Sequence, residues 1–198
     1  MTEQYIRSRR LVLSEINPDA KRTVDVLSRQ LGWPLQSERE EDRDEWTPRQ
    51  IVWGVGPAIT LQYQEDLLSD LAYLFVVGSD PKAVQNTLDI AAAHLPVWTL
   101  TGLVDAVRGE TDPDDLPYAI HRLGLGAPRQ FDEDVYACIT EHIRSEDPEV
   151  RDSAVWAVTY EPWPEHVDAL RELLSTNSDD ELSRTVRNLL LEMSKEGV

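Results

Sequence analysis

The chain has 198 residues, of which 41% are hydrophobic, so it fits one large domain or two small ones. Its formal net charge of -18 disfavours binding to a phosphate backbone, which makes nucleic acid a poor partner. No apolar run is long enough to cross a bilayer, and the charged stretch Met1 to Arg10 does not resemble a signal peptide, so we expect a cytoplasmic protein without a membrane segment.

The first half of the chain begins with a strand pattern followed by a helix pattern. Tyr5 to Leu13 carries the β-branched and aromatic residues typical of a strand. Asn17-Pro18-Asp19 then starts a helix, which Gly32-Trp33-Pro34 ends. The polar run Ser37 to Glu45 follows, and its many carboxylates predict a solvated loop.

Three further strands and one helix are predicted after this loop. Ile51-Val52-Trp53 leads through a glycine-rich turn into Ile59 to Gln64, where apolar and polar residues alternate as in a strand with one wet face. Leu71 to Val77 is continuously apolar, like a central strand, and Asp80-Pro81 supplies the cap and first residue of the next helix. A proline ends that helix, and Val97 to Val104 is predicted to be the last strand.

The order of these elements is β-α-β-β-α-β if Ile51 to Gln64 is one bent strand, and it has one extra strand if this segment is a hairpin. This order is typical of a ferredoxin-like sandwich, in which two helices pack on one face of an antiparallel sheet. We therefore predict a ferredoxin-like α/β domain over residues 1–110. Because this fold serves enzymes, regulatory domains and interaction modules alike, it indicates no function by itself.

The second half of the chain, residues 111–198, repeats itself. Asp112-Pro113-Asp114 realigns with Asp147-Pro148-Glu149, and the same offset carries Ala119 onto Ala154. A third, more closely spaced copy begins at Asp179-Asp180-Glu181-Leu182. Each copy joins an acidic N-cap region to a helix with a small buried residue, a turn, and a second amphipathic helix. The sequence therefore predicts a series of helical hairpins.

The best copy, Asp147 to Val158, resembles the first helix of HEAT and HEAT-like PBS repeats, whose pattern is D-P-x-V-R-x-x-A-x-x-A-L. The resemblance covers residues 112–193 and implies a short stack of hairpins used for binding, in which Arg151 braces neighbouring repeats. Stacked hairpins bury their apolar faces against one another. We therefore expect the α/β domain to cap one end of the stack and the helix Glu181 to Met193 to close the other. The predicted fold class is α+β.

Histidines, the cysteine and the glycines form no catalytic or cofactor-binding pattern. Cys138 falls on an apolar stripe, which predicts a buried thiol. Gly54-Val55-Gly56 lacks the third glycine and the helix of a dinucleotide-binding turn. The histidines share no metal-ligand spacing, and we place them at helix surfaces or ends: His94, His121, His142 and His166. We therefore predict no cofactor and no metal, and favour a protein that is not an enzyme.

The aromatic turn between two helices of the best repeat is the first candidate for a binding surface. Prolines stiffen this turn, and tryptophan and tyrosine are common anchors of protein interfaces. The candidate residues are Trp156, Tyr160, Glu161, Trp163 and Glu165. The tryptophans are also large enough to fill gaps between repeats instead. Trp46, at the end of the acidic run, is a second candidate, with a solvated loop as its alternative.

These features favour a non-enzymatic protein-binding module, such as an adaptor, inhibitor or immunity-type protein, that uses an acidic HEAT-like surface. A small-molecule binder or lyase-type enzyme with a site between the two domains is one alternative, and an acidic mimic of DNA is another. The acidity itself has two explanations, a binding surface or a host adapted to high salt or rich in GC.

Overall fold

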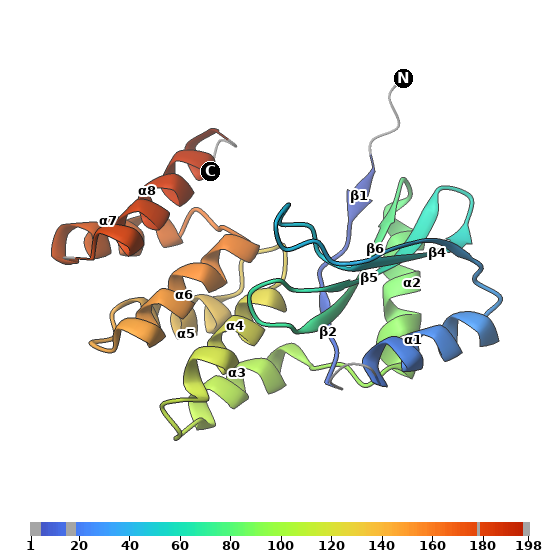
Figure 1. Cartoon of the computed structure of the whole chain (residues 1–198), viewed down its shortest axis with the longest axis horizontal. Coiled ribbons are helices and arrows are strands. Elements are labelled where there is room, and N and C mark those ends of the chain that lie inside the picture. The colour runs from blue at the N-terminus through green and yellow to red at the C-terminus, as the bar shows by residue number, and fades with distance from the viewer. Residues whose placement is uncertain (1–4, 15–18, 178, 196–198) are drawn as a thin grey trace. The chain divides into compact units, whose positions relative to one another are not determined.

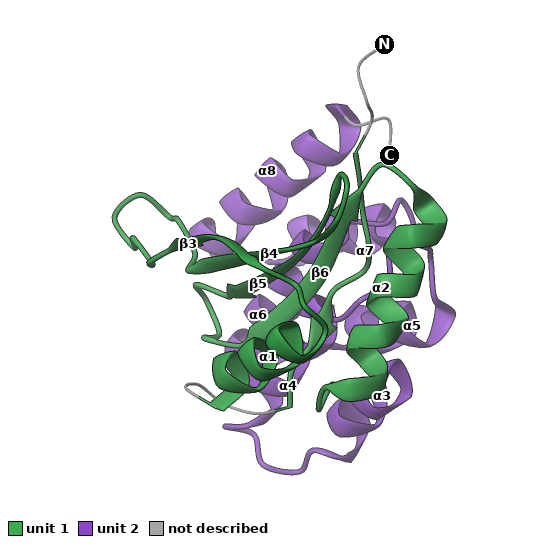
Figure 2. Ribbon diagram, turned by 90° about the vertical axis from the view of Figure 1, so that its right-hand side faces the viewer, with its two compact units in different colours: residues 1–98 green, residues 99–198 purple. Residues whose placement is uncertain are grey.

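A computed structural model describes residues 5–14, 19–177 and 179–195, which form an antiparallel sheet and eight helices (Figure 1). The class α+β is confirmed. The chain divides into two compact units, residues 1–98 and 99–198 (Figure 2). We expected the boundary after residue 110. The observed division lies earlier because the segment that follows Trp98 forms a helix that packs on the helices of the second unit.

The described part of unit 1 contains a six-stranded sheet in the order β1-β6-β5-β4-β3, with β2 also paired to β6. Its strands are β1 (Ile6–Arg7), β2 (Leu11–Val12), β3 (Leu35–Arg39), β4 (Gln50–Gly56), β5 (Ile59–Glu65) and β6 (Ala72–Gly78). Ile6 lies opposite Gly78 and Val12 lies opposite Tyr73, so β1 and β2 follow one side of β6. The single strand expected over Tyr5 to Leu13 is therefore divided in two.

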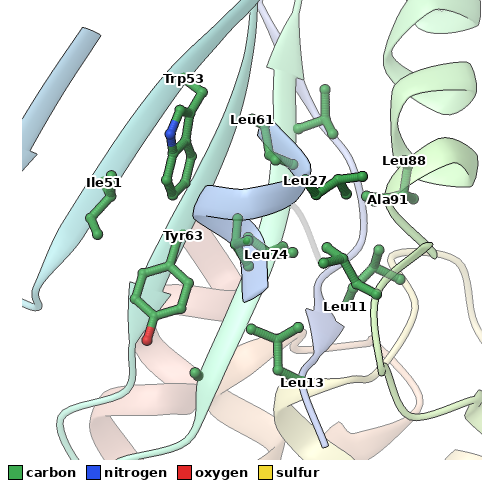
Figure 3. Close-up of a cluster of buried hydrophobic side chains, with 14 of the residues drawn as sticks. Leu11, Leu13, Leu27, Ile51, Trp53, Leu61, Tyr63, Leu74, Leu88 and Ala91 are labelled. Atoms are coloured by element: carbon green, nitrogen blue, oxygen red, sulfur yellow. The ribbon is translucent and has the colours of Figure 1, made fainter. Parts of the chain in front are cut away.

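Helices α1 (Asp19–Gln30) and α2 (Pro81–His94) cover one face of this sheet, and the core of unit 1 lies between them and the strands (Figure 3). Alternate residues of the central strands supply the core from the sheet side: Ile51, Trp53, Leu61, Tyr63, Leu74 and Val76. As expected, Asp80 caps α2, with its Oδ1 accepting a hydrogen bond from the Lys82 amide at 2.9 Å.

The expected solvated loop over Ser37 to Glu45 is wrong in its first part, because Leu35–Arg39 forms the strand β3. It pairs with β4, with Glu38 opposite Ile51 and Arg39 opposite Gln50. All five residues of β3 are exposed. An edge strand wetted on both faces tolerates charged side chains, so it shows no apolar alternation that local sequence could have revealed.

The strand expected over Val97 to Val104 is also wrong, because Leu100–Gly109 forms the helix α3. Thr99 caps it by accepting a hydrogen bond from the Gly102 amide on its Oγ1 at 3.0 Å. Leu103, Val104 and Val107 are buried at helical spacing. The N-cap and this spacing outweigh the β-branched residues. The observed order of unit 1 therefore differs from β-α-β-β-α-β.

Unit 2 consists of α3, α4 (Leu116–Leu125), α5 (Glu133–Ile143), α6 (Pro148–Tyr160), α7 (His166–Thr176) and α8 (Asp180–Lys195). Helices α3, α5 and α7 follow one another through side-by-side contacts, and so do α4, α6 and α8. Consecutive helices also touch, except α6 and α7, which share few contacts. The unit is therefore a two-layered stack in which the chain crosses repeatedly from one layer to the other.

Helices α4 and α6 approach each other closely at Gly124 and Ala157. A Cβ atom added to Gly124 would lie 2.5 Å from both the Cα and the Cβ of Ala157. These distances are far shorter than a van der Waals contact, so the two helix backbones can only meet here because residue 124 is glycine.

Replacing Gly124 by alanine is therefore expected to lower the free energy of unfolding by about 1–3 kcal/mol, because the added methyl group must push two helix backbones apart. Gly109 is the matched control, since an added Cβ there meets nothing within 4 Å. Gly109→Ala is expected to leave stability unchanged or to raise it slightly through helix propensity. Urea unfolding of both variants measures the difference, and equal stability would contradict the close packing of α4 on α6.

Candidate functional site

Helix α6 is part of the stack and carries residues of the strongest candidate surface. Asp147 caps it, with its Oδ1 accepting hydrogen bonds from the Glu149 amide at 2.9 Å and the Val150 amide at 3.4 Å. Most of the helix is buried, including Ala154, Val155, Ala157 and Val158. Trp156 is only partly buried.

A groove lies between α6 and α8, and Trp156 stands in its middle. One end is a cavity of about 460 Å³ lined by Trp156, Thr159, Pro162, Thr185, Asn188, Leu189, Glu192 and Met193. The other end is a cavity of about 240 Å³ lined by Pro148, Arg151, Asp152, Trp156, Asp179, Glu181, Leu182 and Thr185. Because Trp156 and Thr185 line both cavities, we treat the two as one site and call it the α6–α8 groove.

The α6–α8 groove is apolar at one end and acidic at the other. Leu189 and Met193 lie in the larger cavity, whereas Asp152, Asp179 and Glu181 lie in the smaller one. Burial raises the pKa of the Asp152 carboxyl, and the charges of Asp179 and Glu181 raise it further. Three carboxylates therefore crowd one end of the groove at neutral pH, which is a favourable place for a cation.

Arg151 only partly offsets this negative charge, because its guanidinium is engaged by the backbone. Its Nη1 donates to the carbonyl oxygens of Ser145 at 2.9 Å and Glu146 at 3.3 Å. These bonds tie the start of α6 to the turn that precedes it. The geometry gives Arg151 a structural role at the start of α6.

The residues expected to form the aromatic surface lie in different environments. Trp156 lines the groove, Tyr160 and Glu161 are partly buried at the C-terminal end of α6, and Glu165 is exposed. Trp163 is only 5% exposed and belongs to the interior of unit 2. It therefore fills a gap between helices, which was the alternative interpretation of this residue.

Trp163 is part of an aromatic cluster formed by α5, α7 and the connecting segments that precede them. Its indole lies parallel to the His166 ring with the ring centroids 5.5 Å apart, and the edge of Phe131 approaches it at the same distance. Tyr136 on α5 packs against both Phe131 and His166. This cluster holds the turn between α6 and α7 against α5.

His166 lies at a helix end, as expected, but its side chain is buried rather than exposed. It is the first residue of α7 but is only 1% exposed. Neither of its ring nitrogens has a hydrogen-bond partner in the described part of the chain. Burial lowers the pKa of His166 to about 4, so the imidazole is neutral at physiological pH.

Trp46, the second candidate, belongs to unit 1 and is no part of the α6–α8 groove. It is 68% exposed and has a φ of 49°, in the left-handed region that tryptophan rarely adopts. Its turn follows β3.

The groove residues on α8 were missed by sequence reasoning. Thr185, Asn188 and Glu192 border the buried stripe of α8, which consists of Leu182, Val186, Leu189 and Met193. The stripe itself is visible in the sequence as a helical period. Which of its borders opens into a groove depends on how α8 lies beside α6, and no local pattern contains that information.

Cys138 is buried on α5, as predicted, and burial raises the pKa of its thiol to about 11. The thiol therefore stays protonated at neutral pH and is a poor nucleophile. Among the residues that the structure describes, no cluster of three or more His, Cys, Asp or Glu side chains is arranged to hold a metal ion. None of the described helices combines the length and apolar character needed to span a membrane.

Comparisons of the chain with protein-family models, with curated proteins and with solved structures find no match.

The stability of the protein is expected to fall by up to about 3 kcal/mol between pH 6.5 and pH 4 through His166 alone. The unfolded chain binds a proton at His166 near pH 6.5, whereas the folded chain resists protonation down to a pKa of about 4. The contribution of His166 to the free energy of unfolding is therefore fully present above pH 6.5 and is lost as the pH falls toward 4.

Urea unfolding across this pH range tests the effect of His166. His166→Phe keeps a ring beside Trp163 and should remove this part of the pH dependence. His94→Gln is the control, because His94 is exposed on α2 and should leave the pH dependence unchanged. The same pH profile in His166→Phe and in the unmodified protein would show that His166 does not carry the effect.

Proposed function

We propose that the chain is a non-enzymatic protein-binding module, of the adaptor, inhibitor or immunity type, whose binding surface is the α6–α8 groove. The observation that carries the proposal is the position of Trp156, which lines both cavities of the groove between an apolar end and an acidic end. A partly buried tryptophan in a groove is a common anchor of protein interfaces.

We also propose that unit 2 is a short HEAT-like stack. Three features support this assignment: two layers of helices in side-by-side contact, the Asp147 cap followed by Pro148 at the start of α6, and the bonds from Arg151 to the preceding turn. Stacks of this kind expose helix faces that suit binding to other proteins.

The chemistry of the groove favours one kind of partner. The larger cavity offers the partly exposed Trp156 indole to an apolar side chain, above the buried Leu189 and Met193. The smaller cavity offers Asp152 and Asp179 to a lysine or arginine, beside Glu181, which also pairs with Arg184 at 3.8 Å. Such a cation would offset the mutual repulsion of these carboxylates. A partner segment with an apolar side chain beside a basic one fits both ends.

An acidic site also affects the kinetics of binding. Complementary charge accelerates the encounter of two proteins and weakens with ionic strength, whereas apolar burial at Trp156 chiefly slows dissociation. The proposed interface should therefore associate more slowly at high salt and still persist once it has formed.

Trp156→Ala is expected to weaken binding of the partner at least about tenfold, because it removes the anchor shared by both cavities. The measurement is capture of partner proteins from native extract on the immobilised chain over a series of salt concentrations, followed by calorimetry with the captured protein. Tyr118→Ala is the matched control, since Tyr118 is an exposed aromatic residue of the same unit and lies on α4, outside the groove.

Two results would count against the proposal. One is equal capture by Trp156→Ala and the unmodified chain. The other is the absence of any enriched protein at every salt concentration while circular dichroism shows that the chain remains folded.

A further inference from the structure

The two edges of the sheet in unit 1 differ in what covers them. On the side of β2, the segment before α3 covers the strand: the Trp98 amide donates to the Val12 carbonyl at 2.9 Å, and the Ser14 amide donates to the Pro96 carbonyl at 2.8 Å. At the other end of the sheet, β3 pairs with β4 and with no other strand of the described chain.

The outer edge of β3 is therefore a row of backbone groups without a strand partner. All five of its residues are exposed, and the Leu35 side chain is 55% exposed. An open edge of this kind can accept a further strand through main-chain hydrogen bonds.

The fixed turn that joins β3 to β4 presents Trp46. Asp42 and Thr47 exchange two backbone hydrogen bonds of 2.9 and 2.8 Å, and the Asp42 Oδ1 accepts from the amides of Asp44 and Glu45. Arg43 adds ion pairs to Glu41 and Asp70. Trp46 is thus held at a φ of 49° with 68% of its surface exposed.

The charge around the edge selects the kind of strand that can bind. Glu38 is already neutralised by Lys21 and Arg49, whose hydrogen bonds lower the pKa of its carboxyl. Asp44 and Glu45 make no ion pair with any residue that the structure describes. A second copy of this chain would bring the same negative charge to the edge, whereas a basic segment would be attracted to it.

We propose that the outer edge of β3, together with Trp46, binds an extended segment of another protein that carries lysine or arginine, and that the segment joins the sheet as an additional strand. Main-chain hydrogen bonds to β3 supply affinity that does not depend on side chains. The Trp46 indole offers a face to a lysine or arginine side chain, and the carboxylates of Asp44 and Glu45 attract the same cation. This surface lies in unit 1 and is independent of the α6–α8 groove.

The probe is an acetylated and amidated peptide of alternating valine and lysine, about six residues long to match β3. Two control peptides separate the contributions. One replaces lysine by glutamate, and the other keeps lysine but carries methyl groups on alternate backbone nitrogens, so that it cannot pair as a strand. Binding to the full chain is measured by NMR titration, and protection of β3 by amide hydrogen exchange.

The valine–lysine peptide should bind at least about tenfold more tightly than either control peptide and should slow amide exchange in β3. Trp46→Asn, which tolerates the left-handed backbone, should weaken this binding several-fold. Leu68→Ala is the matched variant, because Leu68 is also exposed in unit 1 and lies in a different turn, and it should bind as the unmodified chain does.

Several outcomes would overturn the proposal. Equal binding of the N-methylated peptide would show a purely ionic association. Failure of every peptide to bind, or an unchanged affinity in Trp46→Asn, would show that β3 and Trp46 do not form this binding site. Self-association of the chain with protection of β3 in the absence of peptide would assign the edge to a second copy.

Discussion

The contact of Gly124 with Ala157 is the constraint on which the arrangement of unit 2 depends. It lets the backbones of α4 and α6 meet directly, so that α6 is buried along most of its length. The Trp156 side chain then has to emerge on the border with α8, where both cavities lie. A larger residue at position 124 would push α6 away from α4 and change the width of the groove, although neither Gly124 nor Ala157 lines the groove. The candidate site is thus a consequence of how the stack is packed.

The parts of the fold that the sequence predicts are those with a local physical signal. Asp80-Pro81 and Asp147-Pro148 mark helix starts because a carboxylate satisfies the first amides and proline needs no partner there. The alternation over Ile59 to Gln64 marks β5 because one face of the strand is buried. Strand β3 has no such signal, since both of its faces are wet and only pairing with β4 makes it a strand. In α3, the Thr99 cap favours a helix more strongly than the β-branched residues favour a strand.

The residues of the candidate site differ in the same way, because some have a local signal in the sequence and others depend on packing. The local sequence makes Trp156 a candidate anchor, because it lies near a proline-rich turn. In the structure its side chain lines the groove. Trp163 has the same local signal but is buried by Phe131 and by His166, which stacks on it. Because Phe131 is distant in the sequence, its contact with Trp163 depends on packing that no local pattern contains. The acidity of unit 2 is concentrated where Asp152, Asp179 and Glu181 lie close together.

The central claim is that the α6–α8 groove holds a partner protein through an apolar and basic segment. The most direct test places a photo-activated benzophenone side chain at Thr185, which lines both cavities, or at Glu141, which is exposed on α5. After irradiation in native extract, mass spectrometry identifies the cross-linked peptide. We predict a single partner protein cross-linked from position 185, through a peptide with lysine or arginine beside apolar residues, and none from position 141. The same products from both positions, or no product from position 185 of a folded chain, would contradict the claim.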